Sequence, residues 1–499
     1  MTDNEKQASL LNINQLLLAT GGRLISENKE CCFTSVQTDS RNVTPGALFV
    51  PLRGENQNGH KYIPQALEKG ACVVFVDEKE LSENSDLYEE LCSKNPAVAF
   101  VCVKNNLHAL QDAAEAYVAQ FPELIKISIT GSSGKTTTKE MLASVLRQHF
   151  GKEGLICTEG NLNSETGLPL SVFKIKGSEK AGVFEMGMNR VDEIGEISKV
   201  LKSKYGIITN IGNAHIGILG SRKNIALEKR KSFKYIPQDG AAFIPADDDF
   251  ADFCTEEVKG KVVKYGPSCA GAFGVEFIKD DGLAGTEFSV DGVLVKLSLS
   301  GKYNYQNALG VIALAKELGV SAAEIKAGLE GISAVSGRME TKEIKTVTGK
   351  TVRLIADCSN ANPDSMGKVI EFCGELETEG AGATGAGATG SARKVFVLGD
   401  MKELGDKAAT EHRGVAQKIL AASADYVCLV GPEMKNAADY LEENHYHNYS
   451  YFKANDEAGS KMIAEKLLSI LDNGDILLLK GSHSMALETI IPLLEGGAK

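Results

Sequence analysis

The sequence predicts an α/β protein of three domains, on the strength of its length, its alternating elements and one glycine-rich loop. Its 499 residues are too many for a single hydrophobic core. Apolar strands alternate with helical stretches, which is typical of parallel sheets with crossover helices. The loop GSSGKTTT at 131–138 joins one such strand to a helix. We therefore expect a central parallel-sheet domain, a smaller N-terminal α/β domain and a C-terminal α/β domain.

The N-terminal domain is predicted over residues 1–105. Short apolar runs bounded by turn residues predict three strands, at 46–50, 71–76 and 97–103. Residues 106–120 then carry apolar side chains at helical spacing, which predicts a helix at the start of the central domain.

The central domain is predicted over 106–334 and is built around the glycine-rich loop. A buried strand at 125–130 leads into the loop, and a helical stretch at 139–150 follows it. Two further strands are predicted at 181–187 and 205–212. This order predicts a P-loop parallel sheet with crossover helices.

The C-terminal domain is predicted over 335–499 and is expected to be Rossmann-like. The segments VRLIADCS, KVFVLGD and DILLLKGS each predict a strand that ends in a polar loop, with helices between them. Such a sheet has a crevice at its switch point. The Gly, Ala and Thr residues near 376–392 cannot build a core, so they predict a flexible surface insert.

Composition excludes several classes of protein. The net charge of -12, without a segregated basic patch, argues against nucleic acid as a partner. No apolar run reaches transmembrane length and the polar start MTDNEKQASL lacks a signal core, so we expect a cytoplasmic protein that inserts into no membrane. The eleven cysteines lack a CxxC pair, which favours free thiols. We expect a monomer.

The glycine-rich loop predicts a site for nucleotide phosphates. Its backbone N–H groups and the helix N-terminus would face an anion, Lys135 would reach the β and γ phosphates, and Thr136 would bind Mg²⁺. Ile129 stands where the full pattern has glycine, so a plain turn before a helix is the alternative. The phosphate-binding residues predicted here are Gly131, Ser132, Ser133, Gly134, Lys135, Thr136 and Thr137.

The loop resembles the TGxxGKT(T/S) phosphate loop of the Mur ligase family, and the likeness continues along the chain. TEGNLNSETGLP at 158–169 resembles the family's GNxNxxxGxP segment. GKYNYQNALG at 301–310 resembles GxHNxxNAxA, with Tyr303 in place of histidine. DCSNANPDSM at 357–366 is similar to the DxxNANPxSM string of the family branch that adds D-alanyl-D-alanine. VLGDMKELGDKAATEH at 397–412 and LLLKGSHSMALE at 477–488 also resemble that branch, with His483 where arginine is common. VQTDSRNVTPGALFV near the start resembles the family's uridine-nucleotide module.

The resemblance implies two magnesium ions held by Thr136, Glu185, His215 and Lys229. Glu185 lies at the end of one predicted strand and His215 just past another, where a crevice-facing carboxylate or imidazole suits a metal. Lys229 would be carbamylated, since burial gives the neutral amine that reacts with CO₂ and the product offers oxygen ligands. From the residues alone, an exposed carboxylate, a structural histidine and a solvated lysine are the alternatives.

The resemblance also assigns binding residues, which as bare chemistry are polar turns, helix caps or a linker arginine. Those implied for ATP, besides the loop, are Asn161, Asn307, Arg338, Asp357 and Asn360. Those implied for the other substrates are Ser40, Arg41, Asn163, Thr166, Asn362, Asp364 and Ser365.

The implied activity is an ATP-dependent ligase of peptidoglycan precursor synthesis, and hence of cell wall biogenesis, cell shape and division. It would join UDP-N-acetylmuramoyl-tripeptide to D-alanyl-D-alanine through an acyl phosphate, with Lys135, Lys229 and His215 as catalytic residues. Three alternatives remain: a family ligase that adds glutamate, a P-loop ATPase that drives motion or regulates a partner, and a catalytically weakened scaffold.

Overall fold

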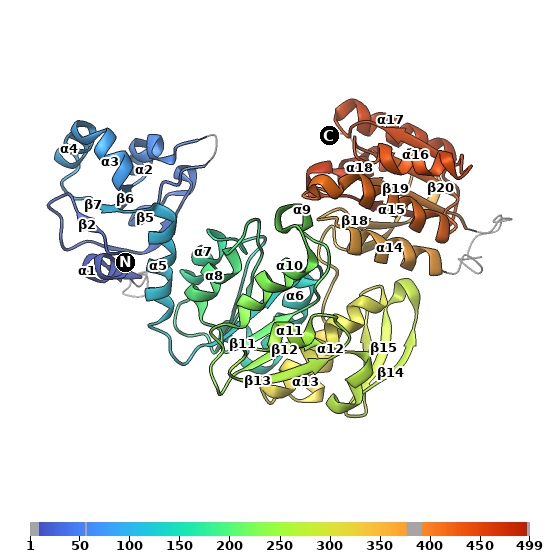
Figure 1. Cartoon of the computed structure of the whole chain (residues 1–499), viewed down its shortest axis with the longest axis horizontal. Helices are drawn as coiled ribbons and strands as arrows, with labels where there is room; N and C mark the ends of the chain where they lie inside the picture. The colour runs from blue at the N-terminus through green and yellow to red at the C-terminus, as the bar shows by residue number, and fades with distance from the viewer. Residues whose placement is uncertain (1–8, 55–56, 377–391, 497–499) are drawn as a thin grey trace.

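The three predicted α/β domains are present in the computed structural model, which describes residues 9–54, 57–376 and 392–496. The N-terminal domain lies at one end of an elongated molecule, the C-terminal domain lies at the other, and the central domain joins them (Figure 1). Each domain has its own main sheet, of five strands in the N-terminal domain and six in each of the others. The predicted Gly/Ala/Thr insert lies almost wholly outside the described residues.

The N-terminal sheet has the order β2-β7-β6-β5-β4, and only the edge pair β2–β7 is antiparallel. Its three central strands confirm the predicted ones. The helix α5 (Asn106–Val118) packs on α1, α7 and α8, so it links the first domain to the second. The strands are β1 (Leu11–Asn12), β2 (Arg23–Leu24), β3 (Cys32–Phe33), β4 (Ser35–Gln37), β5 (Ala47–Phe49), β6 (Val73–Asp77) and β7 (Ala99–Val103), and the helices are α1 (Ile13–Thr20), α2 (Ile63–Glu68), α3 (Glu78–Glu83) and α4 (Ser85–Lys94).

The central sheet is fully parallel, in the order β13-β12-β11-β8-β10-β9, with β8 between β10 and β11. Every predicted strand of this domain is confirmed. A small antiparallel sheet of three strands, which no motif predicted, follows it. The main strands are β8 (Ile125–Thr130), β9 (Leu155–Cys157), β10 (Ala181–Glu185), β11 (Tyr205–Ile208), β12 (Ala241–Pro245) and β13 (Lys261–Tyr265), and the small sheet contains β14 (Val275–Asp280), β15 (Thr286–Val290) and β16 (Val293–Leu297).

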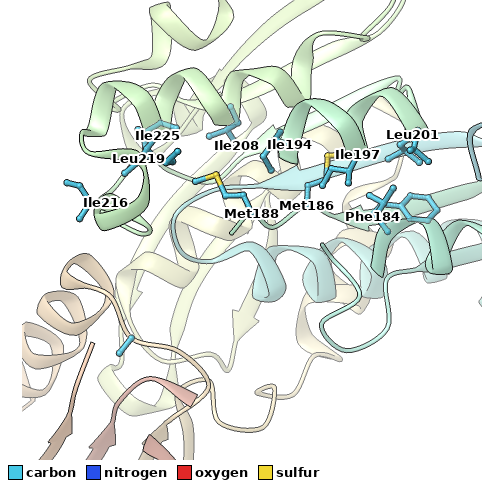
Figure 2. Close-up of a cluster of buried hydrophobic side chains, with 14 of the residues drawn as sticks. Phe184, Met186, Met188, Ile194, Ile197, Leu201, Ile208, Ile216, Leu219 and Ile225 are labelled. Carbon is cyan, nitrogen blue, oxygen red and sulfur yellow. The ribbon is translucent and has the colours of Figure 1, made fainter. Parts of the chain in front are cut away.

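Helices cover both faces of the central sheet because side chains alternate along its strands. Val183 packs with α6, α12 and α13 on one face, whereas Phe184 packs with α7 and α8 on the other. Figure 2 shows the second face, where Ile194 and Ile197 of α8 lie over the sheet. The helices are α6 (Lys135–Phe150), α7 (Gly167–Val172), α8 (Glu193–Leu201), α9 (Ile216–Leu219), α10 (Arg222–Lys229), α11 (Ala251–Thr255), α12 (Lys302–Glu317) and α13 (Ala322–Glu330).

The C-terminal sheet has the order β17-β18-β22-β19-β20-β21, and only the edge pair β17–β18 is antiparallel. The three strands predicted here are confirmed as β18, β19 and β22. The strands are β17 (Glu340–Lys345), β18 (Thr351–Asp357), β19 (Lys394–Gly399), β20 (Tyr426–Val430), β21 (Tyr449–Phe452) and β22 (Ile476–Lys480), and the helices are α14 (Pro363–Glu375), α15 (Ala408–Ala421), α16 (Lys435–Glu443), α17 (Glu457–Ile470) and α18 (Ile490–Glu495).

The acidic run 247–249 is a structural turn. Asp248 accepts hydrogen bonds from the amides of Ile211 and Phe250, and Asp249 pairs with Arg222. All eleven cysteines are free thiols. In the described ranges, no helix is long and apolar enough to cross a membrane.

Candidate active site

A cavity of about 310 Å³ lies where the central and C-terminal domains meet. The carboxyl ends of β8 and β10 contribute one wall, and the carboxyl ends of β18 and β22 contribute the other. Most residues singled out by the sequence line it: Ser132, Ser133, Gly134, Lys135, Thr136, Thr137, Asn161, Asn163, Glu185, His215, Asn307, Arg338, Asp357, Asn360, Asn362 and Ser365. Segments more than 200 residues apart in the chain therefore form one site.

The glycine-rich loop packs closely against neighbouring segments of the central domain. Gly131 and Gly134 have φ of +152° and +82°, and a Cβ on Gly131 would lie 1.8 Å from Oγ1 of Thr209. The Ser133 amide donates to Oδ1 of Asn210 at 3.2 Å. The first N–H groups of α6, which begins at Lys135, have no carbonyl partner within the helix. The amides of Ser132 and Ser133 are thus both engaged by Asn210, and the N-terminus of α6 offers the backbone donors for an anion.

Glu185 at the end of β10 has one oxygen in use and one available. Oε1 accepts a hydrogen bond from Nδ2 of Asn163 at 2.7 Å. Oε2 is buried and has no hydrogen-bond partner among the residues that the structure describes. A buried carboxylate oxygen without a donor is costly unless a cation completes it. Thr136, at the first turn of α6, adds a buried hydroxyl to the same wall, so these donors fit Mg²⁺.

A buried lysine that sequence reasoning missed fixes this wall from behind. Lys139 Nζ donates to the carbonyl oxygen of Thr158 at 2.7 Å, and Oγ1 of Thr158 accepts from the Glu185 amide at 3.0 Å. Lys139 is only 1% exposed. It lies one helical turn after Lys135, and that spacing was the available signal.

Lys229 and Lys135 converge on one backbone carbonyl. Each Nζ lies 2.9 Å from the carbonyl oxygen of Gly131. Burial lowers the pKa of Lys229 well below its ordinary value, and the nearby charge of Lys135 lowers it further. A neutral amine at this position can react with CO₂, but an unmodified lysine offers a metal no oxygen. Lys229 is buried, and neither it nor Gly131 is among the residues that line the cavity.

His215 immediately precedes α9 and has a left-handed backbone, with φ of +63°. Its Nδ1 lies 2.5 Å from Oε2 of Glu403, which comes from the C-terminal domain. Both residues line the cavity. Glu403 was not predicted, although it lies in the polar loop that follows the predicted strand KVFVLGD.

Charged side chains of the C-terminal wall are paired with each other. Lys480, buried at the end of β22, donates to Oδ2 of Asp357 at 2.6 Å and to the carbonyl oxygen of Asn360 at 2.9 Å. The register of β18 and β22 places Asp357 opposite Lys480. Lys480 was missed as well, although a lysine that ends an apolar strand is a visible signal.

The NANPDS segment also docks on the phosphate loop. Asn362 caps α14 with Ser365, and its Nδ2 lies 3.4 Å from the carbonyl oxygen of Ser132. Asp364 accepts a hydrogen bond from the amide of Asn213 in the central domain. The polar groups of Asn362 and Asp364 are thus engaged between the domains.

A mixed polar and aromatic corner lies beside the loop. Asn307 packs on Gly134, where a Cβ would lie 2.8 Å from Oδ1 of the amide. The Tyr303 hydroxyl is buried, with no hydrogen-bond partner in the described part of the chain. Burial first, and Asp357 second, raise the Tyr303 pKa well above its ordinary value. A neutral hydroxyl can therefore donate to a ligand here.

Three predicted residues lie elsewhere. Ser40 is buried and donates to Oε1 of Gln65 at 2.7 Å, whereas Arg41 is exposed and pairs with Asp39. Both belong to the N-terminal domain, far from the C-terminal domain (Figure 1). Oγ1 of Thr166 lies 3.2 Å from Oγ of Ser164, outside the cavity lining.

Comparison with known proteins places every domain in one family. The models described as "Mur ligase family, catalytic domain", "Mur ligase middle domain" and "Mur ligase, glutamate ligase domain" match residues 33–118, 129–315 and 337–483. A UDP-N-acetylmuramoyl-tripeptide–D-alanyl-D-alanine ligase of Treponema pallidum (strain Nichols) is 37% identical over 97% of this chain and 99% of its own. The ligase of that name from Bacillus subtilis (strain 168) is 30% identical over 91% of this chain and 92% of its own.

Solved structures agree. MurF from Acinetobacter baumannii has 27% identity and a TM-score of 0.81, covering 98% of this chain and all (100%) of that one. MurF ligase from Thermotoga maritima, solved in complex with ADP, has 24% identity and a TM-score of 0.72, covering 93% and 97%, and so shares the fold.

Proposed function

Because this chain belongs to the Mur ligase family, and to its MurF-type members, we propose that it joins D-alanyl-D-alanine to UDP-N-acetylmuramoyl-tripeptide at the expense of ATP. It is an ATP-dependent ligase of peptidoglycan precursor synthesis. The observation that carries the specific proposal is that the phosphate loop and Glu185 share one cavity with residues of the NANPDS segment. The enzyme would act in the cytoplasm as a monomer, and its product would serve cell shape and division. The proposed domain limits are 105/106 and 334/335.

The phosphates of ATP would bind in the glycine-rich loop. Residues 131–137 would donate backbone hydrogen bonds, and Lys135 would neutralise the transferring phosphoryl group. Phosphoryl transfer needs positioning and charge neutralisation more than side-chain acid–base chemistry. The remaining ATP contacts proposed are Asn161, Asn307, Arg338, Asp357 and Asn360.

The proposed ligands of two magnesium ions are Thr136, Glu185, His215 and carbamylated Lys229. Magnesium bound there would supply positive charge opposite the phosphate oxygens. The buried free oxygen of Glu185 and the depressed pKa of Lys229 support these assignments.

The reaction would proceed in two steps. The terminal carboxylate of the tripeptide attacks the γ-phosphorus, so ADP leaves and an acyl phosphate forms. The amine of D-alanyl-D-alanine then attacks the carbonyl carbon, phosphate leaves and the amine loses a proton. Walls from two domains would exclude water from the acyl phosphate. Asn163, Thr166, Asn362, Asp364 and Ser365 are proposed near the peptide ends, and Ser40 and Arg41 on the uridine nucleotide.

A ligation assay tests the proposal. Purified protein is given Mg-ATP and UDP-N-acetylmuramoyl-tripeptide, with D-alanyl-D-alanine, L-glutamate or no acceptor. We expect ADP, phosphate and amide product to form in equal amounts when D-alanyl-D-alanine is the acceptor, and no amide product to form with L-glutamate or without an acceptor. Equal phosphate release without an acceptor would identify an ATPase, and amide formation with glutamate would identify the other branch of the family.

A further inference from the structure

The loop 401–405 of the C-terminal domain follows β19 and docks on α9 of the central domain. The Gly217 amide donates to the carbonyl oxygen of Glu403 at 3.1 Å. A Cβ on Gly217 would lie 2.4 Å from the amide nitrogen of Gly405, so only glycine permits this approach. Leu404 is 2% exposed in the contact. The position of the loop is thus fixed by backbone contacts, independently of the Glu403 side chain.

The helix α9 is itself anchored to the central domain. Ile216 and Leu219 are buried in its apolar core (Figure 2). His215 immediately precedes them, and its left-handed φ of +63° turns the chain into the helix. The imidazole therefore has a fixed point of attachment, while its ring orientation depends on its partners.

Glu403 is the partner that the docked loop supplies. It also has a left-handed backbone, with φ of +63°, and its Oε2 lies 2.5 Å from Nδ1 of His215. In the described part of the chain, Nδ1 has no hydrogen-bond partner besides this carboxylate contact. Glu403 and His215 line the cavity together with Lys135 and Glu185.

Imidazole has two nitrogens, and the partner of one decides what the other can do. When a carboxylate accepts a hydrogen bond from the N–H of Nδ1, Nε2 keeps its lone pair and can bind a metal. Such outer carboxylates also hold the ring in orientation, and removing them typically weakens metal affinity by about 10–100-fold.

We propose that Glu403 is a positioning residue that prepares His215 to bind a divalent cation, and that it does so only when the C-terminal domain is docked. Domain closure and cation binding are then coupled, because each favours the arrangement that the other requires. The inference rests on the proposed function in one respect, which is that His215 is a cation ligand.

Three variants separate the parts of this device. Glu403→Ala removes the carboxylate but keeps the backbone contact with Gly217. Gly217→Ala keeps the carboxylate but drives the loop away, and it suits α9 itself because alanine is a good helix former. Asp406→Asn removes one negative charge from an exposed position next to the loop and is the matched control.

The measurement is Mn²⁺ affinity by electron paramagnetic resonance, with a non-hydrolysable ATP analogue present. We expect Glu403→Ala to weaken Mn²⁺ binding about 10–100-fold, Gly217→Ala to weaken it similarly, and Asp406→Asn to leave it unchanged. The side-chain oxygen of glutamine in Glu403→Gln can still accept a hydrogen bond from Nδ1–H, so this variant should lose less Mn²⁺ affinity. In a His215→Ala background, Glu403→Ala should have no further effect.

Two results would overturn the inference: Mn²⁺ binding within twofold of the wild type in Glu403→Ala, or an equal loss from that change with and without His215. Failure of the underlying proposal is distinguishable, because His215→Ala alone would then leave Mn²⁺ affinity intact. Small-angle scattering gives a second readout. Mn²⁺ with the analogue should compact the wild type more than Glu403→Ala, and equal compaction would contradict the coupling.

Discussion

The two walls of the cavity are built alike but differ in how their charges are satisfied. Each is formed by the carboxyl ends of parallel strands, the place where open α/β sheets bind ligands. On the central wall, Oε2 of Glu185 is buried without a donor within the described ranges, and two lysines crowd one carbonyl. On the C-terminal wall, Asp357 is already paired with Lys480.

This difference separates two tasks. The central wall is incomplete without ligands, because it holds an unsatisfied carboxylate and a buried amine of depressed pKa. The C-terminal wall is complete in itself and can move as a preformed surface. We infer that the chemistry depends on the central wall, whereas the C-terminal wall mainly positions the nucleotide and closes the site.

The largest effect is expected on the central wall, from Lys135→Ala. Loss of the charge that faces the transferring phosphoryl group should reduce kcat by about a thousandfold or more. Lys223→Ala, on the exposed face of α10, is the control and should ligate normally. Near-normal turnover by Lys135→Ala would remove the distinction between the walls.

The next largest effect is expected from Lys229→Ala, which should lower kcat by about a hundredfold or more because a metal ligand would be missing. The cavity left behind can admit a small acid, so acetate or formate should restore part of the activity. The measurement is kcat with increasing acid, with Lys135→Ala as the variant that the acid should not rescue. An absence of rescue in a folded Lys229→Ala protein would argue against a carbamate.

A smaller effect is expected on the C-terminal wall, from Lys480→Met. Asp357 would lose its buried partner, at a cost of about 1–3 kcal/mol, so the KM for ATP should rise about tenfold while kcat changes little. Lys461→Met, at an exposed site in the same domain, is the control. A large fall in kcat with an unchanged KM would show that this wall takes part in the chemistry.

The smallest effect concerns stability and follows from the pKa of Lys229. The folded protein holds this pKa below the unfolded value of about 10.4, so above the folded pKa the unfolded chain binds more protons. The free energy of unfolding should therefore rise with pH toward 10, by at most about 1.4 kcal/mol per pH unit. Denaturation in CO₂-free buffer should show this rise in the wild type and a weaker one in Lys229→Met. Parallel pH profiles would contradict it.

Much of the fold could be predicted because strong local patterns coincide with real elements. The strand expected at 125–130 is β8, and the helical periodicity from Asn106 becomes α5. The small sheet β14–β16 was missed. Its strand β14 is mostly exposed, but β15 alternates buried and half-buried side chains and joins β16 through Asp291 and Gly292, a hairpin signal that the sequence did offer.

Site residues could be predicted where they belong to a compact sequence motif. They could not be predicted where their role depends on contacts between segments that are distant in the chain. The motif GSSGKTTT predicts a phosphate loop, and most of its residues line the cavity. Glu403, Lys480 and Lys139 contact residues that are distant in sequence. The sequence shows where Lys139 and Lys480 stand, after Lys135 and at the end of an apolar strand, but not which groups they contact. Asn362 and Asp364 were predicted as substrate groups, but in this conformation they hold the two domains together.

The most direct test is calorimetric titration of the purified protein with a non-hydrolysable ATP analogue and Mg²⁺. If residues 130–137 hold the triphosphate between the two walls, binding should be saturable below millimolar analogue and should be lost in Lys135→Ala. No binding at millimolar concentrations, or equal binding by Lys135→Ala, would contradict the phosphate-loop assignment on which the proposed ligation depends.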